Sequence, residues 1–147
     1  MIALPDPAAS ANFGAWLADR VVPGDVITLA GPLGAGKTSI ARGLLAALGL
    51  QGEAPSPSFA IVQPYDVPDV RIPVQHVDLY RIESVDELAE LGLEDGADDV
   101  VLIVEWPERA GPRYWPHALA LTIEVDGDGR RLTAQVPEGW RTRWAQG

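Results

Sequence analysis

The chain of 147 residues contains no cysteine and only a single lysine. Without cysteine it cannot form a disulfide, a thiolate nucleophile or a zinc–thiolate site, which fits a reducing compartment. The first ten residues lack the basic and apolar segments of a signal peptide, and no apolar run approaches the length that crosses a bilayer. We therefore expect a cytoplasmic protein that does not enter a membrane.

Basic side chains are also scarce. Eleven Lys and Arg residues stand against 21 Asp and Glu, so the formal net charge is −10. A chain this acidic repels the phosphate backbone of nucleic acids, which argues against non-specific RNA binding. If the protein acts on RNA, we expect a partner to hold the RNA. The excess charge serves either solubility or electrostatic docking, and the composition does not separate the two.

The single lysine lies in a glycine-rich stretch, GPLGAGKTS, at residues 31–39. Gly31, Gly36, Lys37 and Thr38 match the phosphate-loop pattern G-x-x-x-x-G-K-[ST] in full. Glycines let successive backbone N–H groups point at phosphate oxygens, the lysine binds the outer phosphates, and the threonine hydroxyl can ligate Mg²⁺. The pattern therefore predicts a nucleotide site.

The sequence around this loop has the order that the motif requires. Residues 26–30, VITLA, predict a buried strand, and the apolar residues of 40–48 recur at helical spacing before Gly49. A following helix would direct its positive N-terminus at the phosphates. The alternative is a glycine turn without a ligand, but the only lysine of the chain would then stand at this position by chance.

The rest of the chain alternates between predicted strands and helices. Asp6 and Pro7 favour the start of a helix, and Ser84 with Glu87 forms a capping box for a second, short one. We predict one domain, 1–147, with an α/β, P-loop NTPase-like fold: a mostly parallel central sheet flanked by helices, with a C-terminal β-hairpin. The other predicted strands are 59–63, 74–79 and 100–106, the hairpin strands are 118–125 and 131–136, and the tail 138–147 is expected to be flexible.

Two carboxylates follow apolar strands directly. Asp78 ends the run QHV, and Glu105 ends the run VVLIV. Ligands bind at the carboxyl ends of strands in open α/β sheets, and a phosphate-loop enzyme needs acid near its metal. One acid could bind the metal while the other orients water or acts as a base, and spacing alone leaves the assignment open. The alternative for each is a solvated carboxylate.

These segments together resemble one family. The phosphate loop, SPSF (56–59), HVDLYR (76–81) and VEWPER (104–109) occur in the order seen in TsaE, formerly YjeE. TsaE proteins are small bacterial ATPases needed to make threonylcarbamoyladenosine in tRNA. The likeness covers nearly the whole chain, and the combination of these motifs is far more specific than the phosphate loop alone.

The resemblance implies a role for each matching residue. Lys37, Asp78 and Glu105 would be catalytic, with Asp78 needed for hydrolysis, and Thr38 and Glu105 would hold Mg²⁺. Ser58 would sense the γ-phosphate, Ser10 would lie near the adenine, and Trp106 would lie near the nucleotide or a partner. The remaining contacts to the ATP phosphates would come from Leu33, Gly34, Ala35 and Gly36.

Two positions depart from the family pattern. Pro32 stands where the family usually has Asp, so this position has no backbone N–H to donate. Ser58 stands where the family usually has Thr, which keeps the hydroxyl but loses the stiff β-branch. His76 could shuttle a proton, although a packed histidine is the simpler interpretation.

The resemblance implies an ATPase that acts with the TsaD–TsaB pair and meets tRNA only through that complex. The alternative is a free-standing small-molecule kinase, for which only 108–113 resembles a lid. A GTPase is disfavoured because the N-K-x-D guanine-binding motif is absent: the one asparagine is Asn12 and the one lysine is in the phosphate loop. A nucleotide-binding scaffold without turnover is disfavoured by the intact Thr38, Asp78 and Glu105.

Overall fold

The computed structural model describes residues 2–32, 35–52, 62–93, 96–111 and 114–145. Within them the strands form one seven-stranded sheet in the order β1-β7-β6-β2-β5-β4-β3. The four strands β6, β2, β5 and β4 run parallel to one another, while β7 and β3 run antiparallel to their neighbours. The bounds are β1 Ile2–Leu4, β2 Val26–Ala30, β3 Val62–Tyr65, β4 Val74–Asp78, β5 Val101–Glu105, β6 Leu119–Asp126 and β7 Gly129–Gln135.

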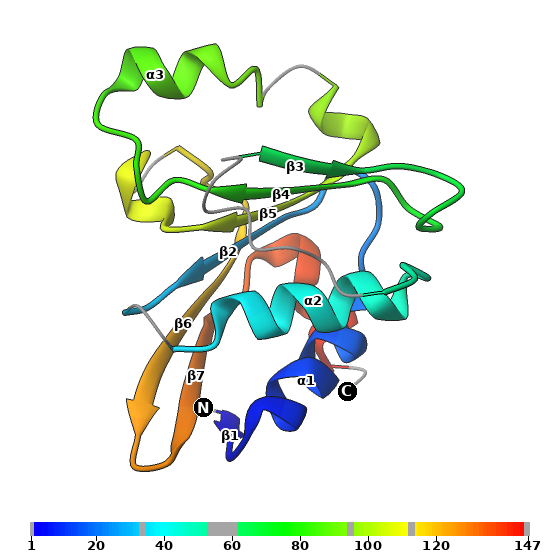
Figure 1. Ribbon diagram of the computed structural model, residues 1–147, viewed down its shortest axis with the longest axis vertical. Helices are drawn as coiled ribbons and strands as arrows, with labels where there is room; N and C mark the ends of the chain where they lie inside the picture. Colours follow the sequence, from blue (N-terminus) through cyan, green and yellow to red (C-terminus); the bar gives the residue numbers. More distant parts are fainter. Residues whose placement is uncertain (1, 33–34, 53–61, 94–95, 112–113, 146–147) are drawn as a thin grey trace.

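Helices cover both faces of the sheet (Figure 1). Helices α1 and α2 lie side by side against one face, and α3 lies on the other. The central strand β5 explains why both faces need cover, because all five of its residues are buried and alternate residues join different hydrophobic clusters. The helices are α1 Pro7–Ala18, α2 Lys37–Ala47, α3 Val85–Glu90 and α4 Arg141–Ala145, with 3₁₀ turns η1 Ala97–Asp99, η2 Pro107–Arg109 and η3 Glu138–Trp140.

The predicted fold class is confirmed: a single-domain α/β fold with a mixed, mostly parallel sheet and the hairpin β6–β7. Both predicted helix caps are present. The Asp6 carboxylate accepts a hydrogen bond from the Ala9 N–H at 2.8 Å, and the Ser84 hydroxyl accepts one from the Glu87 N–H at 3.2 Å. The predicted strand 59–63 begins later, at Val62, and its first three positions lie outside the described residues.

Helix α2, which follows the phosphate loop, is fixed in place by a close crossing with α1. A Cβ atom on Gly14 of α1 would stand 2.1 Å from the Ile40 carbonyl oxygen, and one on Gly43 of α2 would stand 2.2 Å from that of Ala11. Only glycine at these two positions lets the helix backbones come this close. The start of α2 is therefore positioned by packing along the length of the helix.

The C-terminal tail, for which we expect flexibility, has regular secondary structure over residues 138–145. These residues form η3 and α4, and Trp140 is only 2% exposed. The Arg143 guanidinium donates to both oxygens of Asp25 at 2.6 and 3.1 Å, which ties the tail to the start of β2. No helix of the described residues is long and apolar enough to span a bilayer.

Candidate active site

Four of the predicted site residues, Lys37, Thr38, Asp78 and Glu105, lie together at the carboxyl ends of β4 and β5. The parallel register pairs Asp78 directly with Glu105, so the two acids are neighbours on adjacent strands. Helix α2 begins at Lys37, and Gly36 before it has φ +97°, a left-handed conformation that strongly favours glycine. Leu33, Gly34 and Ser58, which were assigned to phosphate contacts, lie outside the described residues.

Glu105 and Thr38 form the centre of this arrangement. The Thr38 hydroxyl stands 3.2 Å from Oε1 and 3.3 Å from Oε2 of Glu105, and it donates between the two oxygens. Glu105 is 3% exposed, although it carries a carboxylate at the end of an apolar strand. A buried carboxylate and a hydroxyl at this separation form a compact pair of hard oxygen ligands.

Asp78 lies beside Glu105 but makes a different contact. Its Oδ1 accepts a hydrogen bond from the Tyr80 N–H at 2.8 Å, across the turn that follows β4. Asp78 is 6% exposed. The contact fixes the orientation of this carboxylate independently of Glu105, so the two acids can serve different purposes.

Lys37 is buried among these acids. Its Nζ donates to the Gly31 carbonyl oxygen at 2.6 Å and lies 3.4 Å from the centre of the Trp106 ring. Burial lowers the pKa of the Lys37 ammonium below the ordinary lysine value, while the nearby carboxylates of Glu105, Glu108 and Asp78 act in the opposite direction. At this lysine the effect of burial therefore outweighs the attraction of the three carboxylates.

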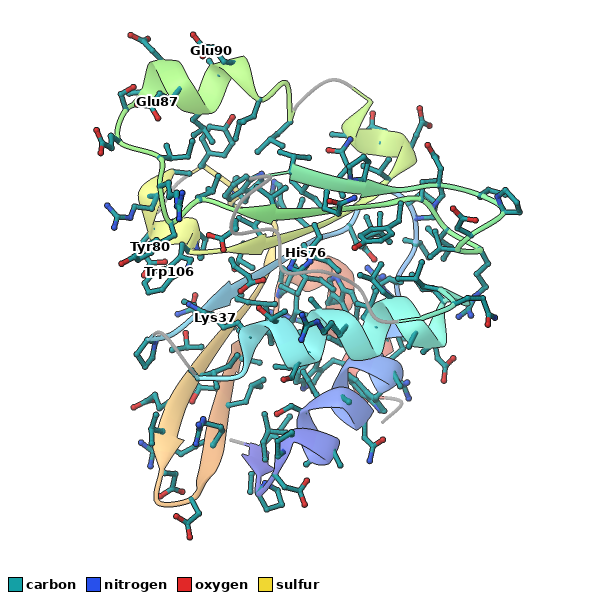
Figure 2. The ribbon with its side chains drawn as sticks, in the orientation of Figure 1. Lys37, His76, Tyr80, Glu87, Glu90 and Trp106 are labelled. Atoms are coloured by element: carbon teal, nitrogen blue, oxygen red, sulfur yellow. The ribbon has the colours of Figure 1, made fainter. Side chains whose placement is uncertain are left out.

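Trp106 follows Glu105 in an unusual backbone conformation. Its φ of 61° and ψ of 50° are left-handed, which is rare and strained for a bulky residue. This turn directs the ring over Lys37 and against Tyr80, with the Trp106 and Tyr80 ring centres 4.9 Å apart (Figure 2). Arg109 lies 5.6 Å from the centre of the Tyr80 ring, so an aromatic and basic edge borders the lysine.

His76 is the functional candidate that sequence reasoning undervalued. It is fully buried, and its Nε2 lies 2.6 Å from Oε2 of Glu105. The signal was present in the alternation of β4, because positions 76 and 78 share one face of the strand. What the sequence lacked was the register, which brings that face beside the end of β5. Figure 2 shows His76 between the sheet and α2.

Ser10 lies on α1 beside the start of α2 and is 3% exposed. It lines a cavity of about 210 Å³ together with Gly36 and Ser39, and Asp128 and Arg130 of the hairpin line it as well. The cavity adjoins the phosphate loop. A larger cavity of about 640 Å³ opens at the opposite end of the sheet, around Asp25, and none of the predicted site residues lines it.

The oxygen donors at the site suit a metal cation that takes most of its ligands from water or from a bound nucleotide. Within the described residues, no group of three or more His, Cys, Asp or Glu side chains could hold a metal ion by itself. Thr38 and Glu105 instead offer oxygen ligands only. Mg²⁺ in nucleotide sites is bound in this manner, through one or two protein groups together with phosphate oxygens and water.

Comparison with known proteins identifies relatives along almost the whole chain. The model of the family described as "Threonylcarbamoyl adenosine biosynthesis protein TsaE" matches residues 4–133. The tRNA threonylcarbamoyladenosine biosynthesis protein TsaE of Streptomyces coelicolor is 41% identical over 137 residues, which cover 91% of this chain and 93% of that protein. The protein of the same name from Synechocystis is 43% identical over 110 residues, covering 72% and 69%.

A solved structure is similar as well. The crystal structure of Bacillus subtilis YdiB superposes with a TM-score of 0.73 at 27% sequence identity. The match covers 96% of this chain and 87% of YdiB. The likeness therefore extends over the whole sheet and is not confined to the phosphate loop.

Proposed function

The chain belongs to the TsaE family, and from that premise we propose that it binds and hydrolyses ATP with Mg²⁺ in tRNA threonylcarbamoyladenosine biosynthesis. We further propose that it acts with the TsaD–TsaB pair and meets tRNA only through that complex. A net charge of −10 supports this division of labour, because the protein by itself would repel RNA.

One observation carries the proposal: a buried lysine, a half-buried threonine and a buried glutamate lie together at the start of α2. Lys37 and Thr38 are the first two residues of that helix, whose N-terminus favours phosphate. The Thr38 hydroxyl is already paired with the Glu105 carboxylate. In a structural ion pair the lysine would bond to a carboxylate, whereas here Nζ bonds to the carbonyl oxygen of Gly31. These groups suit a site that binds a phosphate group together with a metal cation.

Thr38 and Glu105 would hold Mg²⁺, and Lys37 would bind the outer phosphates. When bound, the ion would supply charge neutralisation on the phosphate oxygens during transfer. Asp78, held by the Tyr80 N–H, would orient the attacking water or accept its proton. Gly36 and Ala35 would direct backbone N–H groups at the phosphates, as we also expect of Leu33 and Gly34, and Ser58 would sense the γ-phosphate.

The small cavity at Ser10 offers a place for the adenine base of ATP. It adjoins Gly36 at the end of the phosphate loop, and its volume of about 210 Å³ is open to the hairpin residues Asp128 and Arg130. We propose that the adenosine part of ATP enters here. Trp106 would lie near the phosphates from the other side, since its ring already contacts Lys37.

Calorimetry and a phosphate-release assay test this function together. The purified protein should bind ADP and a non-hydrolysable ATP analogue with Mg²⁺, and it should release phosphate slowly from ATP. Absence of nucleotide binding at millimolar concentrations would contradict the proposal. Transfer of phosphate to a metabolite in place of water would favour the kinase alternative instead.

A further inference from the structure

Two elements hold the Glu105 carboxylate from different sides. From α2, the Thr38 hydroxyl approaches both oxygens at 3.2 and 3.3 Å. From β4, His76 Nε2 approaches Oε2 alone at 2.6 Å, and this contact is the shorter one. A separation of this size between ring nitrogen and carboxylate oxygen is that of a short hydrogen bond.

Burying His76 for packing alone would lower the stability of the fold. It is fully buried, and within the described residues its Nδ1 has no hydrogen-bond partner. Its neighbours Val74 and Val77 on β4, and Ile103 opposite it on β5, are apolar and buried. A hydrophobic side chain would fill this position without leaving a polar atom unpaired. Among the described residues, the hydrogen bond from Nε2 to Glu105 is what compensates for this burial.

We propose that His76 is a positioning residue for Glu105. As a carboxylate, Glu105 can only accept hydrogen bonds, so Nε2 carries the proton and donates it to Oε2. This bond fixes the plane of the carboxylate and keeps it beside the Thr38 hydroxyl, as an oxygen pair ready for a divalent cation. Partners of this type behind metal ligands commonly set metal affinity. The inference rests on the proposed function, because it requires Glu105 to be a metal ligand.

Three substitutions separate positioning from packing. In His76→Gln, the side-chain amide nitrogen lies as many bonds from the backbone as Nε2 and can still donate to Glu105. In His76→Asn, the amide reaches only as far as Nδ1, and in His76→Leu no donor remains. We expect His76→Asn and His76→Leu to bind Mn²⁺ with ADP about 10- to 100-fold more weakly than the unchanged protein. His76→Gln should stay within a few-fold.

Mn²⁺ affinity in the presence of ADP, followed by electron paramagnetic resonance, is the readout. ADP affinity in EDTA and the thermal midpoint without nucleotide are the controls, and both should be similar in all folded variants. Equal Mn²⁺ affinity in all variants, or equal losses for Gln and Asn, would overturn the positioning role. If the unchanged protein binds ADP in EDTA but no Mn²⁺, or binds no ADP at all, the proposed function fails before His76 is in question.

A double-variant comparison and a spectroscopic signature keep the test decisive if one variant does not fold. In a Glu105→Ala background, His76→Gln and His76→Asn should bind Mn²⁺ equally, because the group that His76 acts through is gone. The chain has only two histidines, and His117 is exposed, so ¹⁵N spectra of the ring nitrogens are simple to assign. We expect His76 in the Nε2–H form. The Nδ1–H form would contradict the proposal.

Discussion

The two ends of the same parallel strands carry charge in different ways. At the amino end of β2, Arg143 donates to both oxygens of Asp25 and to the carbonyl oxygens of Arg20 and Gly139. At the carboxyl end, the carboxylates of Glu105, Glu108 and Asp78 attract Lys37 electrostatically, yet its hydrogen bond goes to the carbonyl oxygen of Gly31. At the amino end, the Arg143–Asp25 ion pair holds the C-terminal tail in place. At the carboxyl end, Lys37 has no such ion pair among the described residues, and a bound anion would provide its partner.

The difference shows how a fold separates stability from function. The hydrogen bonds from Arg143 to protein groups stabilise the folded chain. They hold the C-terminal helix α4 against the rest of the protein. A buried cation without a direct carboxylate partner costs stability, and sites for ligands commonly carry such costs. Substitutions at the two ends should therefore affect different measurements.

The largest expected effect is on turnover, from Asp78→Asn. The asparagine keeps an oxygen for the Tyr80 N–H, so the local structure should persist. Loss of the carboxylate should lower the ATP hydrolysis rate by about 10²- to 10⁴-fold, while nucleotide affinity changes only a few-fold. Phosphate release and calorimetry measure the two quantities. Near-normal hydrolysis would show that Asp78 is not the group that orients or deprotonates water.

Next in size is the loss of nucleotide affinity in Lys37→Met. Methionine fills much of the same space but cannot bind phosphate, so the affinity for ATP should fall at least about 100-fold, the size expected for truncating one member of a buried charge pair. Equilibrium binding of a fluorescent ATP analogue measures this change. Unaltered affinity would mean that the glycine-rich loop at 31–38 does not hold phosphates through its lysine.

At the opposite end, Arg143→Met should lower stability and spare the site. The Arg143 and Asp25 side chains are 24% and 10% exposed, so the pair lies between buried and surface cases. We expect a loss of about 1–3 kcal/mol in the free energy of unfolding, measured with urea. ATP affinity should remain within two-fold or so of the unchanged protein's. A fall in affinity as large as that of Lys37→Met would remove the distinction between the two ends.

The smallest effect has the opposite sign. Because burial lowers the pKa of Lys37, the folded state without nucleotide disfavours the lysine charge. Lys37→Met should therefore slightly stabilise the nucleotide-free protein at neutral pH.

The lowered pKa of Lys37 also makes the free energy of unfolding depend on pH. Between the lowered pKa in the folded state and the usual value of 10.5, the unfolded chain binds more protons at this group, so the Lys37 contribution to stability rises with pH. The stability advantage of Lys37→Met should shrink over that window. Urea unfolding of both proteins at several alkaline pH values measures it, and a constant or growing advantage would contradict this sign.

Local patterns predicted much of this arrangement. The caps at Asp6 and Ser84, the hairpin β6–β7 and the strand β5 follow from short-range chemistry and alternation, and the structure has all of them. The acids Asp78 and Glu105 could be placed at strand ends for the same reason. Their direct pairing depends on the register between β4 and β5, which no local pattern specifies.

Contacts between distant segments account for the features that sequence reasoning missed. The bond from His76 to Glu105 spans 29 positions in the chain, and the Arg143–Asp25 pair spans 118. The position of the Trp106 ring over Lys37 depends on a left-handed backbone at a tryptophan, which propensities disfavour. Such strained residues occur where function demands them, and that is where sequence rules are expected to fail.

The proposed function is tested most directly by the rate of ATP hydrolysis by the pure protein, alone and with the TsaD and TsaB proteins of the same organism. We predict slow turnover by the protein alone and a clear rise when both partners are added, abolished in either case by Lys37→Met. Equal rates with and without partners would leave a nucleotide site but contradict its role in the complex, and hydrolysis by Lys37→Met at the normal rate would contradict the site itself.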